Sequence, residues 1–450
     1  MTTCALHLPE IRTHIAIFLS NNDCISCMCV SKEWFMDFAG PVWYTIDFDK
    51  DDSFFQIPPE VIVRYGRHIR KAIHVAKEVD ILSLLNPGIT ALTNLEVSVT
   101  HSRFSLVLLQ DLARCHRPSL TTLRITGDMI PTRTFDEQKK NGVYLSLDAI
   151  GPSCRLTALT LSEVCIPRAA FSCILEFSPS LVSLTLTNVI FVDYNPSLDL
   201  FRHPGLKALE STRNQVCGDE GPLPDAQPSL LVHFPALIFW NLTGATVDPF
   251  PKLRLLHATL QTYCPNLKRV LFIAPNPHRI ADTLEKVFVH LEACAFKYRS
   301  LTTDVVMGLL EHSATLRSII MAPSVVKVEI HAADEAASSK RMVGRLLRSC
   351  HRLEVLSVKG HLMDIKFLEE QELECRGTIK ELRVRFCRLK TAVAVDECLH
   401  ELFVRKRGGV VDGSAMVAGS VGRRVCDQLM RFRKLKTVWL GTTDYYLATH

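Results

Sequence analysis

The sequence predicts an α/β repeat protein in which a short all-helical segment precedes a solenoid of helix–turn–strand units. Three observations predict this class: an apolar pattern that recurs along most of the chain, amphipathic stretches of helical period between its occurrences, and a separate helix-forming pattern near the N-terminus. Units of this kind cannot bury their apolar faces alone. Stacking them places parallel strands on a concave side and helices on a convex side.

The recurring pattern is apolar-x-x-apolar-x-apolar. The alternation of its last two apolar positions is the period of a strand with one buried face. Successive occurrences begin 20 to 49 residues apart, so the longer steps require insertions. The pattern begins at Leu92, Leu120, Leu156, Leu181, Leu206, Leu237, Leu267, Leu316, Leu353, Ile379, Leu399 and Leu435.

Helices are predicted between these strands because apolar residues there recur three and four positions apart, so that each helix can lay one stripe on a sheet. The stretches span 104–115, 168–177, 255–264, 303–313 and 341–350. Helix, turn and strand therefore form the repeating unit.

Over roughly residues 65 to 445 this organisation resembles the irregular, ribonuclease-inhibitor-like leucine-rich-repeat proteins, whose steps are about 20 to 29 residues. The asparagine or cysteine that follows the strand in regular families is mostly missing. Four cysteines instead precede strands by two to five residues, and we expect them to be small buried residues that close helices. They are Cys115, Cys154, Cys264 and Cys350.

The N-terminal segment has its own helical pattern. Pro9 suits the first turn of a helix, where its missing N–H costs nothing. The polar run from Ser20 to Asp23 ends this helix and offers caps for a second one, predicted from about Cys24 to Phe38. So short an apolar segment makes a marginal core, which implies a partner.

The same segment resembles an F-box. The family module docks on a Skp-type adaptor, which links it to a cullin scaffold in a ubiquitin ligase of the SCF kind, and the appended repeats hold the substrate. One departure is Cys24, which stands where these modules commonly have leucine. The motifs that carry the resemblance are Leu8-Pro9-Glu10 with Ile11, Ile15-x-x-Phe18-Leu19, Val30-Ser31-Lys32-x-Trp34, and Trp43 before an extended segment.

The resemblance implies a set of adaptor-binding residues and a role for the chain as a non-catalytic substrate-recognition subunit. An apolar cluster rimmed by charges is how a helix is recognised in a groove. The residues that this implies are Leu8, Pro9, Ile11, Ile15, Phe18, Leu19, Val30 and Trp34.

A zinc site is the main alternative for this segment, because Cys4-x-x-His7 and Cys24-x-x-Cys27 have zinc-ribbon spacing. On a helix Cys29 would face about 160° away from Cys27, so the three clustered thiols cannot share an ion. A redox role also lacks the expected strand context. We therefore expect no metal.

No catalytic site or cofactor is predicted. The chain has no phosphate-binding loop and no motif of the common hydrolases or dinucleotide-binding enzymes. The glycine-rich stretch 407–422 is interpreted as a flexible insertion in the last repeats. The predicted domains are an F-box over 1–50, a linker with a capping helix over 51–68, and the repeat solenoid over 69–450.

Composition points to a protein of the cytosol, the nucleus or both. The 16 cysteines lack the context of secretion, and no apolar run reaches the roughly 20 residues that span a bilayer. The net charge of +5 is too small to imply nucleic acid or membrane as partner, but residues 376–436 hold fifteen Lys and Arg against six Asp and Glu. We expect Arg383 and Arg385 to bind an acidic or phosphorylated client.

Two other functions stay open on the sequence alone. One is a non-degradative, adaptor-bound scaffold. The other is a plain repeat interaction protein whose N-terminal helices pack on the solenoid.

Overall fold

The structure is a computed structural model of the 450-residue chain. Its described part divides into two compact units, Met1–Ala236 and Leu237–His450. The described residues are 8–49, 57–99, 106–127, 155–192, 201–212, 214–218, 221–222, 230–242, 253–272, 277–288, 290–297, 301–322, 342–363, 365–370, 373–386, 420–439 and 444–446.

The first unit begins with three helices, α1 (Pro9–Ala16), α2 (Asn21–Met28) and α3 (Lys32–Tyr44). Pro9 opens α1, and the Ser20 side chain accepts a hydrogen bond from the Asp23 N–H to cap α2. The prediction of one helix from Cys24 to Phe38 is wrong. The chain ends α2 at Met28 and starts α3 after Ser31, whose hydroxyl accepts from the Trp34 N–H.

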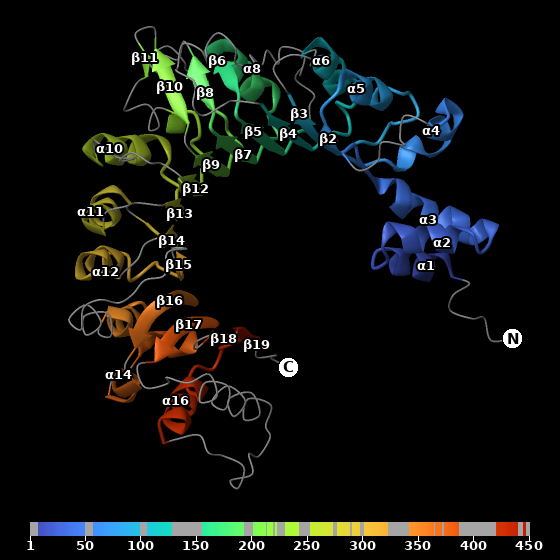
Figure 1. The fold of residues 1–450 in the computed structure, drawn as a ribbon. Helices are drawn as coiled ribbons and strands as arrows, with labels where there is room; N and C mark the ends of the chain where they lie inside the picture. The colour runs from blue at the N-terminus through green and yellow to red at the C-terminus, as the bar shows by residue number, and fades with distance from the viewer. Residues whose placement is uncertain are drawn as a thin grey trace, which may run out of the picture. The chain divides into compact units, whose positions relative to one another are not determined.

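A parallel sheet follows these helices in the first unit (Figure 1). Each strand pairs in parallel with the next one named, and the order along the sheet is the order along the chain. The strands are β1 (Thr45–Asp47), β2 (Lys71–Val75), β3 (Asn94–Ser98), β4 (Thr122–Thr126), β5 (Ala158–Ser162), β7 (Ser183–Thr187) and β9 (Ala208–Thr212).

Helices and a small second sheet connect these strands. The helices are α4 (Pro59–Tyr65), the short 3₁₀ helix η3 (Gly66–His68), α5 (Glu78–Leu84), α6 (Leu106–Cys115) and α8 (Arg168–Phe177). The second sheet has the order β11, β10, β8, β6, and only its β10–β11 pair is antiparallel. Its strands are β6 (Cys165–Pro167), β8 (Ile190–Val192), β10 (Gln215–Gly218) and β11 (Gly221–Pro222).

The second unit continues the same alternation. Its strands pair in parallel in chain order, except that the last one pairs antiparallel. The strands are β12 (Phe239–Leu242), β13 (Arg269–Phe272), β14 (Ala293–Lys297), β15 (Ser318–Ala322), β16 (Val355–Met363), β17 (Glu381–Phe386), β18 (Thr437–Trp439) and β19 (Asp444–Tyr446).

The helices of the second unit include α10, α11 and α12, which cover one side of strands β13 to β15 (Figure 1). The helical elements are α10 (Leu253–Tyr263), α11 (Pro277–Val287), α12 (Thr303–Leu310), a helix over 342–349, α14 (Ile365–Glu370), the 3₁₀ helix η4 (Glu374–Gly377) and α16 (Ser420–Met430).

The core of each unit is built by the second apolar position of the repeated pattern. In the first unit Leu95, Leu123, Leu159, Leu184 and Leu209 are neighbours across the sheet and are buried. In the second unit the equivalent buried row runs from Trp240 to Val438. The predicted α/β fold, a leucine-rich-repeat solenoid of stacked helix–turn–strand units, is therefore confirmed.

One repeat was missed by the pattern. Strand β14 lies within the 49-residue step between Leu267 and Leu316, and it has Cys294 at the second apolar position and Phe296 at the third. Both side chains are buried. The predicted strand at Leu399 lies outside the described residues, as does the predicted glycine-rich insertion up to residue 419, whereas residues 420–422 begin α16.

Of the four cysteines expected to be buried before strands, Cys264 and Cys350 are buried as predicted. Cys115 is exposed, which corrects the prediction, because its neighbour His116 occupies the buried position instead. Cys154 lies outside the described residues. Burial raises the pKa of Cys264 and of Cys350 to about 12, so both thiols stay protonated at neutral pH.

Buried histidines connect successive repeats. His116 donates from Nε2 to the Leu84 carbonyl over 3.0 Å, and His312 donates from Nε2 to the Leu284 carbonyl over 2.8 Å. Each bond satisfies a carbonyl near the end of the preceding repeat's helix. Burial lowers the pKa of both histidines, because the charged ring would lose its hydration.

These histidines predict a loss of stability on mild acidification. An unfolded histidine has a pKa near 6.5. Because the folded pKa is lower, the unfolded chain binds more protons, so stability is full above about pH 6.5 and is lost as pH falls toward the folded pKa. Replacing both rings, His116→Phe with His312→Phe, should lower stability at pH 7.5, since two buried carbonyls lose donors at about 1 to 3 kcal/mol each.

The free energy of unfolding of this double variant should nevertheless depend less on pH between pH 7 and pH 5 than that of the unchanged protein. Urea unfolding at several pH values would measure it. His74 contributes in the opposite sense, because its hydrogen bond to Asp47 raises its pKa. His74→Gln is therefore the control, and it should steepen the dependence. If the free energy of unfolding changed equally with pH in all three proteins, His116 and His312 would not be the cause of the loss of stability on acidification.

No helix in the part of the chain that the structure describes is both long and apolar enough to cross a membrane.

Candidate interaction surface on the N-terminal helices

Three residues of the predicted adaptor-binding set form a stripe on α1. Leu8, Ile11 and Ile15 are three and four positions apart, so they lie on one side of the helix. Leu8 and Ile11 are exposed and Ile15 is half-buried, while Arg12 and Ala16, centred about 90° further round the helix, are buried. The stripe is therefore a part of α1 that the other two helices leave largely uncovered. Pro9 is exposed at the start of the same helix.

Phe18 and Val30 extend the exposed apolar surface at two turns. Phe18 follows α1 and is 76% exposed, with its ring edge-on to that of His14 at a centroid distance of 5.3 Å. Val30 lies between α2 and α3 and is 63% exposed. Large apolar side chains at such exposure gain little from the fold of the module itself.

Leu19 and Trp34 lie differently from the rest of the predicted set. Both pack against the small internal cluster of the module, which comprises Ala16, Cys24 and Phe38. The Trp34 ring stacks on Phe38 with centroids 5.4 Å apart. Their visible role is to hold the helices together, and direct contact of either residue with a partner stays a prediction.

Exposed apolar residues that the sequence pattern did not single out are Ile17, Ile25 and Met36. A further unpredicted feature is an ion pair between helices: the guanidinium of Arg12 on α1 lies 2.6 Å from Asp37 on α3, and both side chains are largely buried.

Cys24 acts as a packing residue. It is 1% exposed, and its thiol lies 3.7 Å from the Ala16 carbonyl, to which it can donate. Burial, followed by the nearby Cys27 and Asp23, raises the pKa of Cys24. Cys27 is half-buried and Cys29 exposed. Two residues of the alternative zinc site, Cys4 and His7, lie outside the described residues. Among the described residues, no three His, Cys, Asp or Glu side chains lie close enough together to hold a metal ion.

Helix α3 is joined to the repeats through defined contacts. Its Phe35 and Trp43 contact the ring of Tyr65 on α4 at centroid distances of 5.8 and 5.7 Å. After Tyr44 the chain passes directly into β1, which pairs with β2. Helix α4 lies within the segment 51–68 that was predicted to hold a linker and a capping helix, and residues 45–47 of the predicted F-box segment belong to the repeat sheet.

The predicted client residues are only partly described. Arg383 lies on β17 between the buried Leu382 and Val384, so it points to the opposite face of the sheet. Its Nε is 2.7 Å from the Glu381 carboxylate, and the side chain is 20% exposed. Arg385 follows on the same strand, but its side chain is not among those that the structure describes. A half-buried arginine that is already paired offers little charge to a partner.

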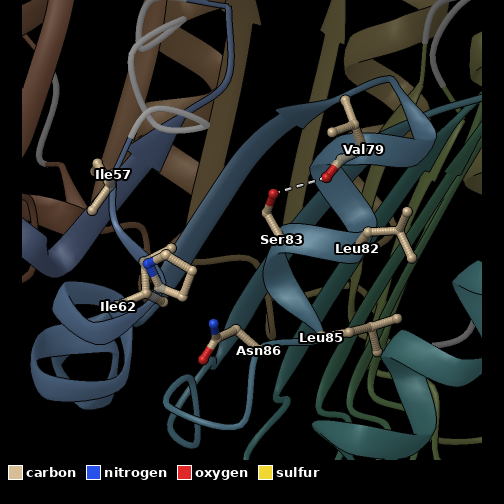
Figure 2. A pocket seen from close by; sticks show the side chains of 8 residues that line it. Ile57, Ile62, Val79, Leu82, Ser83, Leu85 and Asn86 are labelled. Carbon is tan, nitrogen blue, oxygen red and sulfur yellow. Dashed lines mark hydrogen bonds between the residues drawn. The ribbon is translucent and has the colours of Figure 1, made fainter.

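A shallow pocket of about 340 Å³ lies between α4 and α5. Figure 2 shows Ile57 and Ile62 on one side and Val79, Leu82 and Leu85 on the other. The Ser83 hydroxyl donates to the Val79 carbonyl over 2.9 Å, as the dashed line marks. The lining contains no titratable side chain, so the pocket has no acid, base or activated nucleophile.

Comparison with known proteins gives little beyond this. The sequence matches no known family model and none of the curated proteins. Among solved structures, a chain of the TLR13–ssRNA13 complex is similar at 15% identity and a TM-score of 0.36, over 71% of this chain and 47% of that one. The fold assignment therefore depends on the strand order of this chain. A leucine-rich-repeat fold suggests a scaffold for protein interaction.

Proposed function

We propose that the chain is the substrate-recognition subunit of an SCF-type ubiquitin ligase, in which α1–α3 dock on a Skp-type adaptor and the repeats hold a client protein. The observation that supports this most directly is the concentration of exposed apolar side chains on a module with a very small core. Of fourteen large apolar side chains exposed in the described residues, eight belong to residues 8–44. Such a concentration marks a protein interface.

The kind of interface follows from where these side chains lie. Five of them lie on one side of α1 or at the turns after α1 and α2, which suits insertion of short helices into an apolar groove. The positions also coincide with the leucine–proline–glutamate start and the apolar residues of the F-box pattern. Burial of Phe18, Val30 and Leu8 by a partner would contribute up to roughly 1.5 to 3 kcal/mol each toward the cost of association.

In this proposal the chain catalyses nothing. A receptor accelerates ubiquitin transfer by holding a client lysine near a charged conjugating enzyme, which turns a bimolecular encounter into a nearly unimolecular one. The contacts of α3 with Tyr65 and the pairing of β1 with β2 support this role, because a firm joint between docking module and repeats fixes the distance between adaptor and client.

The test is affinity purification of the full chain from its own cells. A Skp-type adaptor and a cullin should co-purify, and Leu8→Asp with Pro9→Ala should lower their recovery at least about tenfold, because a carboxylate would be buried in an apolar groove. Val182→Asp with Met307→Ala is the matched control, since both residues are exposed and apolar but lie on the repeats. The control should recover both partners normally.

Two outcomes would overturn the proposal. If no adaptor co-purifies with the unchanged chain, the F-box assignment falls. The ligase role falls, and a non-degradative scaffold takes its place, if the adaptor is recovered without a cullin. The same conclusion follows if depletion of the chain reveals no client that both accumulates and loses its ubiquitin signal.

A further inference from the structure

A row of charged residues runs along one edge of the sheet in the second unit. Each member directly precedes a strand, and since the strands are parallel, all members lie at the edge where the strands begin. We call this row the charge ladder. In order of strands β13 to β18 its members are Lys268, Glu292, Arg317, Glu354, Lys380 and Lys436.

The backbone fixes the spacing of the ladder. The amide of each member donates to the carbonyl of the preceding one over 2.7 or 2.8 Å, from Glu292 on Lys268 to Lys436 on Lys380. Successive members are therefore about one strand spacing apart, roughly 4.8 Å. At this distance neighbouring side chains interact directly.

Charges alternate along most of the ladder. Lys268 lies 3.0 Å from Glu292, Arg317 lies 3.8 Å from Glu354, and Lys380 also pairs with Glu354. The hydrogen bond from Lys268 and the neighbouring Arg317 lower the pKa of Glu292. The hydrogen bond from Lys380, with Arg317 and Lys434, lowers that of Glu354. Each carboxylate thus already has two or more cations around it.

The alternation ends at the last strand. After Lys380 the pattern would place a carboxylate, but the next member is Lys436, and Lys434 lies two residues before it. All three lysines are exposed. Within the described residues neither Lys434 nor Lys436 forms an ion pair with a carboxylate. Glu354 pairs with Lys380 and Arg317, and Glu381 pairs with Arg383. Lys434 and Lys436 therefore form a basic end to the ladder, beside Lys380, which is already paired with Glu354.

We propose that the basic end of the charge ladder binds an acidic segment of a protein, whose carboxylates complete the alternation next to Lys380 and Lys436. The inference rests on the proposed function only in taking this segment to belong to the client. Recognition of acidic clients, predicted from the sequence for Arg383 and Arg385 on β17, is thereby assigned to the edge of the sheet where β17 and β18 begin.

An acidic peptide fits this surface better than a nucleic acid does. The cations extend over only two neighbouring strands, which suits two or three carboxylates, whereas a nucleic acid needs a longer track of phosphate contacts. The same edge also carries Glu292 and Glu354, which would repel a continuous phosphate backbone but would lie beside a short acidic peptide without contacting it.

The experiment measures fluorescence anisotropy of a fluorescein-labelled octaglutamate peptide with the full chain at 50 and 200 mM NaCl. Lys436→Glu should weaken peptide binding at least about tenfold. It should not lower the thermal midpoint, because a glutamate there would pair with Lys380 and remove a contact between like charges. Loss of binding with retained or increased stability is an outcome that damage to the fold cannot produce.

The matched control is Lys207→Glu. Lys207 is exposed and holds the equivalent place before β9, where its amide donates to the Val182 carbonyl, so its ladder neighbour is uncharged. The same change of charge should alter peptide binding less than twofold. Similar weakening by both variants would show that the peptide senses only net charge and would overturn the proposal.

Two further probes distinguish the class of partner. An eight-nucleotide single strand or a phosphatidylserine vesicle that bound more tightly than the peptide, and that Lys436→Glu released, would also overturn it. Failure here is separable from failure of adaptor docking: Lys436→Glu should still recover the Skp-type adaptor, and Leu8→Asp with Pro9→Ala should still bind the peptide.

Discussion

Replacing Arg12 by leucine is expected to unfold the α1–α3 module while the repeats stay folded. The change removes the 2.6 Å contact with Asp37 and leaves this carboxylate, 17% exposed, without its cation. Removing one partner of a buried ion pair typically costs about 3 to 5 kcal/mol. The internal cluster of the module is small, so a loss of this size is comparable with its whole stability.

Hydrogen exchange read by mass spectrometry would measure the effect, because it reports each segment separately. Amides of α1 and α3 should lose protection in the Arg12→Leu variant, and those of β3 to β5 should keep it. Adaptor recovery should fall as well, although the Arg12 side chain is buried inside the module. Unchanged protection in α1 would contradict the importance of the pair.

Two controls separate charge burial from simple truncation. Arg12→Leu combined with Asp37→Leu should regain much of the protection, since replacing both members of a buried pair by apolar residues is often close to neutral. Arg114→Leu breaks a pair of similar residues, Arg114 with Asp111 at 3.2 Å, that is largely exposed on α6. That change should cost less than about 1 kcal/mol.

The strands of the repeats could be predicted because their signal is local. A buried row such as Leu95, Leu123 and Leu159 needs only alternation within a few residues, which is visible in any single stretch. Even Ser211, which breaks the pattern at Leu206, is buried within β9, because neighbouring strands impose the extended conformation. Strand β14 was missed because it has Cys294 at the second apolar position, and the pattern does not count cysteine as an apolar residue.

The candidate site was less predictable because its features depend on contacts between segments. Which apolar residues of α1 face outward follows from the position of α3, and the pairing of Arg12 with Asp37 across 25 positions has no local signature. The charge ladder has the same character. Lys380 and Lys436 are neighbours only because the chain between them returns to the same edge. The sequence shows a basic region there, but not which of its cations lack partners.

Asn214→Ala is expected to destabilise the junction between the last repeats of the first unit by about 2 to 6 kcal/mol. The asparagine is buried between two repeats. Its Nδ2 donates to the Leu186 carbonyl over 3.0 Å and to the Ser211 hydroxyl over 2.8 Å, and its Oδ1 accepts from the Val189 amide over 2.8 Å. The backbone partners fix which way the amide points.

The consequence of this change is set by what is left behind. Alanine would leave a buried N–H and a buried C=O without partners, and each such group costs about 1 to 3 kcal/mol. Asn266→Ala, an exposed asparagine in the second unit, is the matched control and should change little. Hydrogen exchange of β8 and β10, which pair beside Asn214, would locate the loss.

Asn214→Asp tests the hydrogen bond to Leu186 separately, because aspartate keeps an acceptor for the Val189 amide but loses the donor for the Leu186 carbonyl. At neutral pH the buried carboxylate would face that carbonyl, so the loss of protection should equal or exceed that of alanine. Lowering the pH should reverse part of it, since a protonated aspartic acid can donate to the same carbonyl. If aspartate and alanine had equal effects at every pH, the bond to Leu186 would not be what holds the two repeats together.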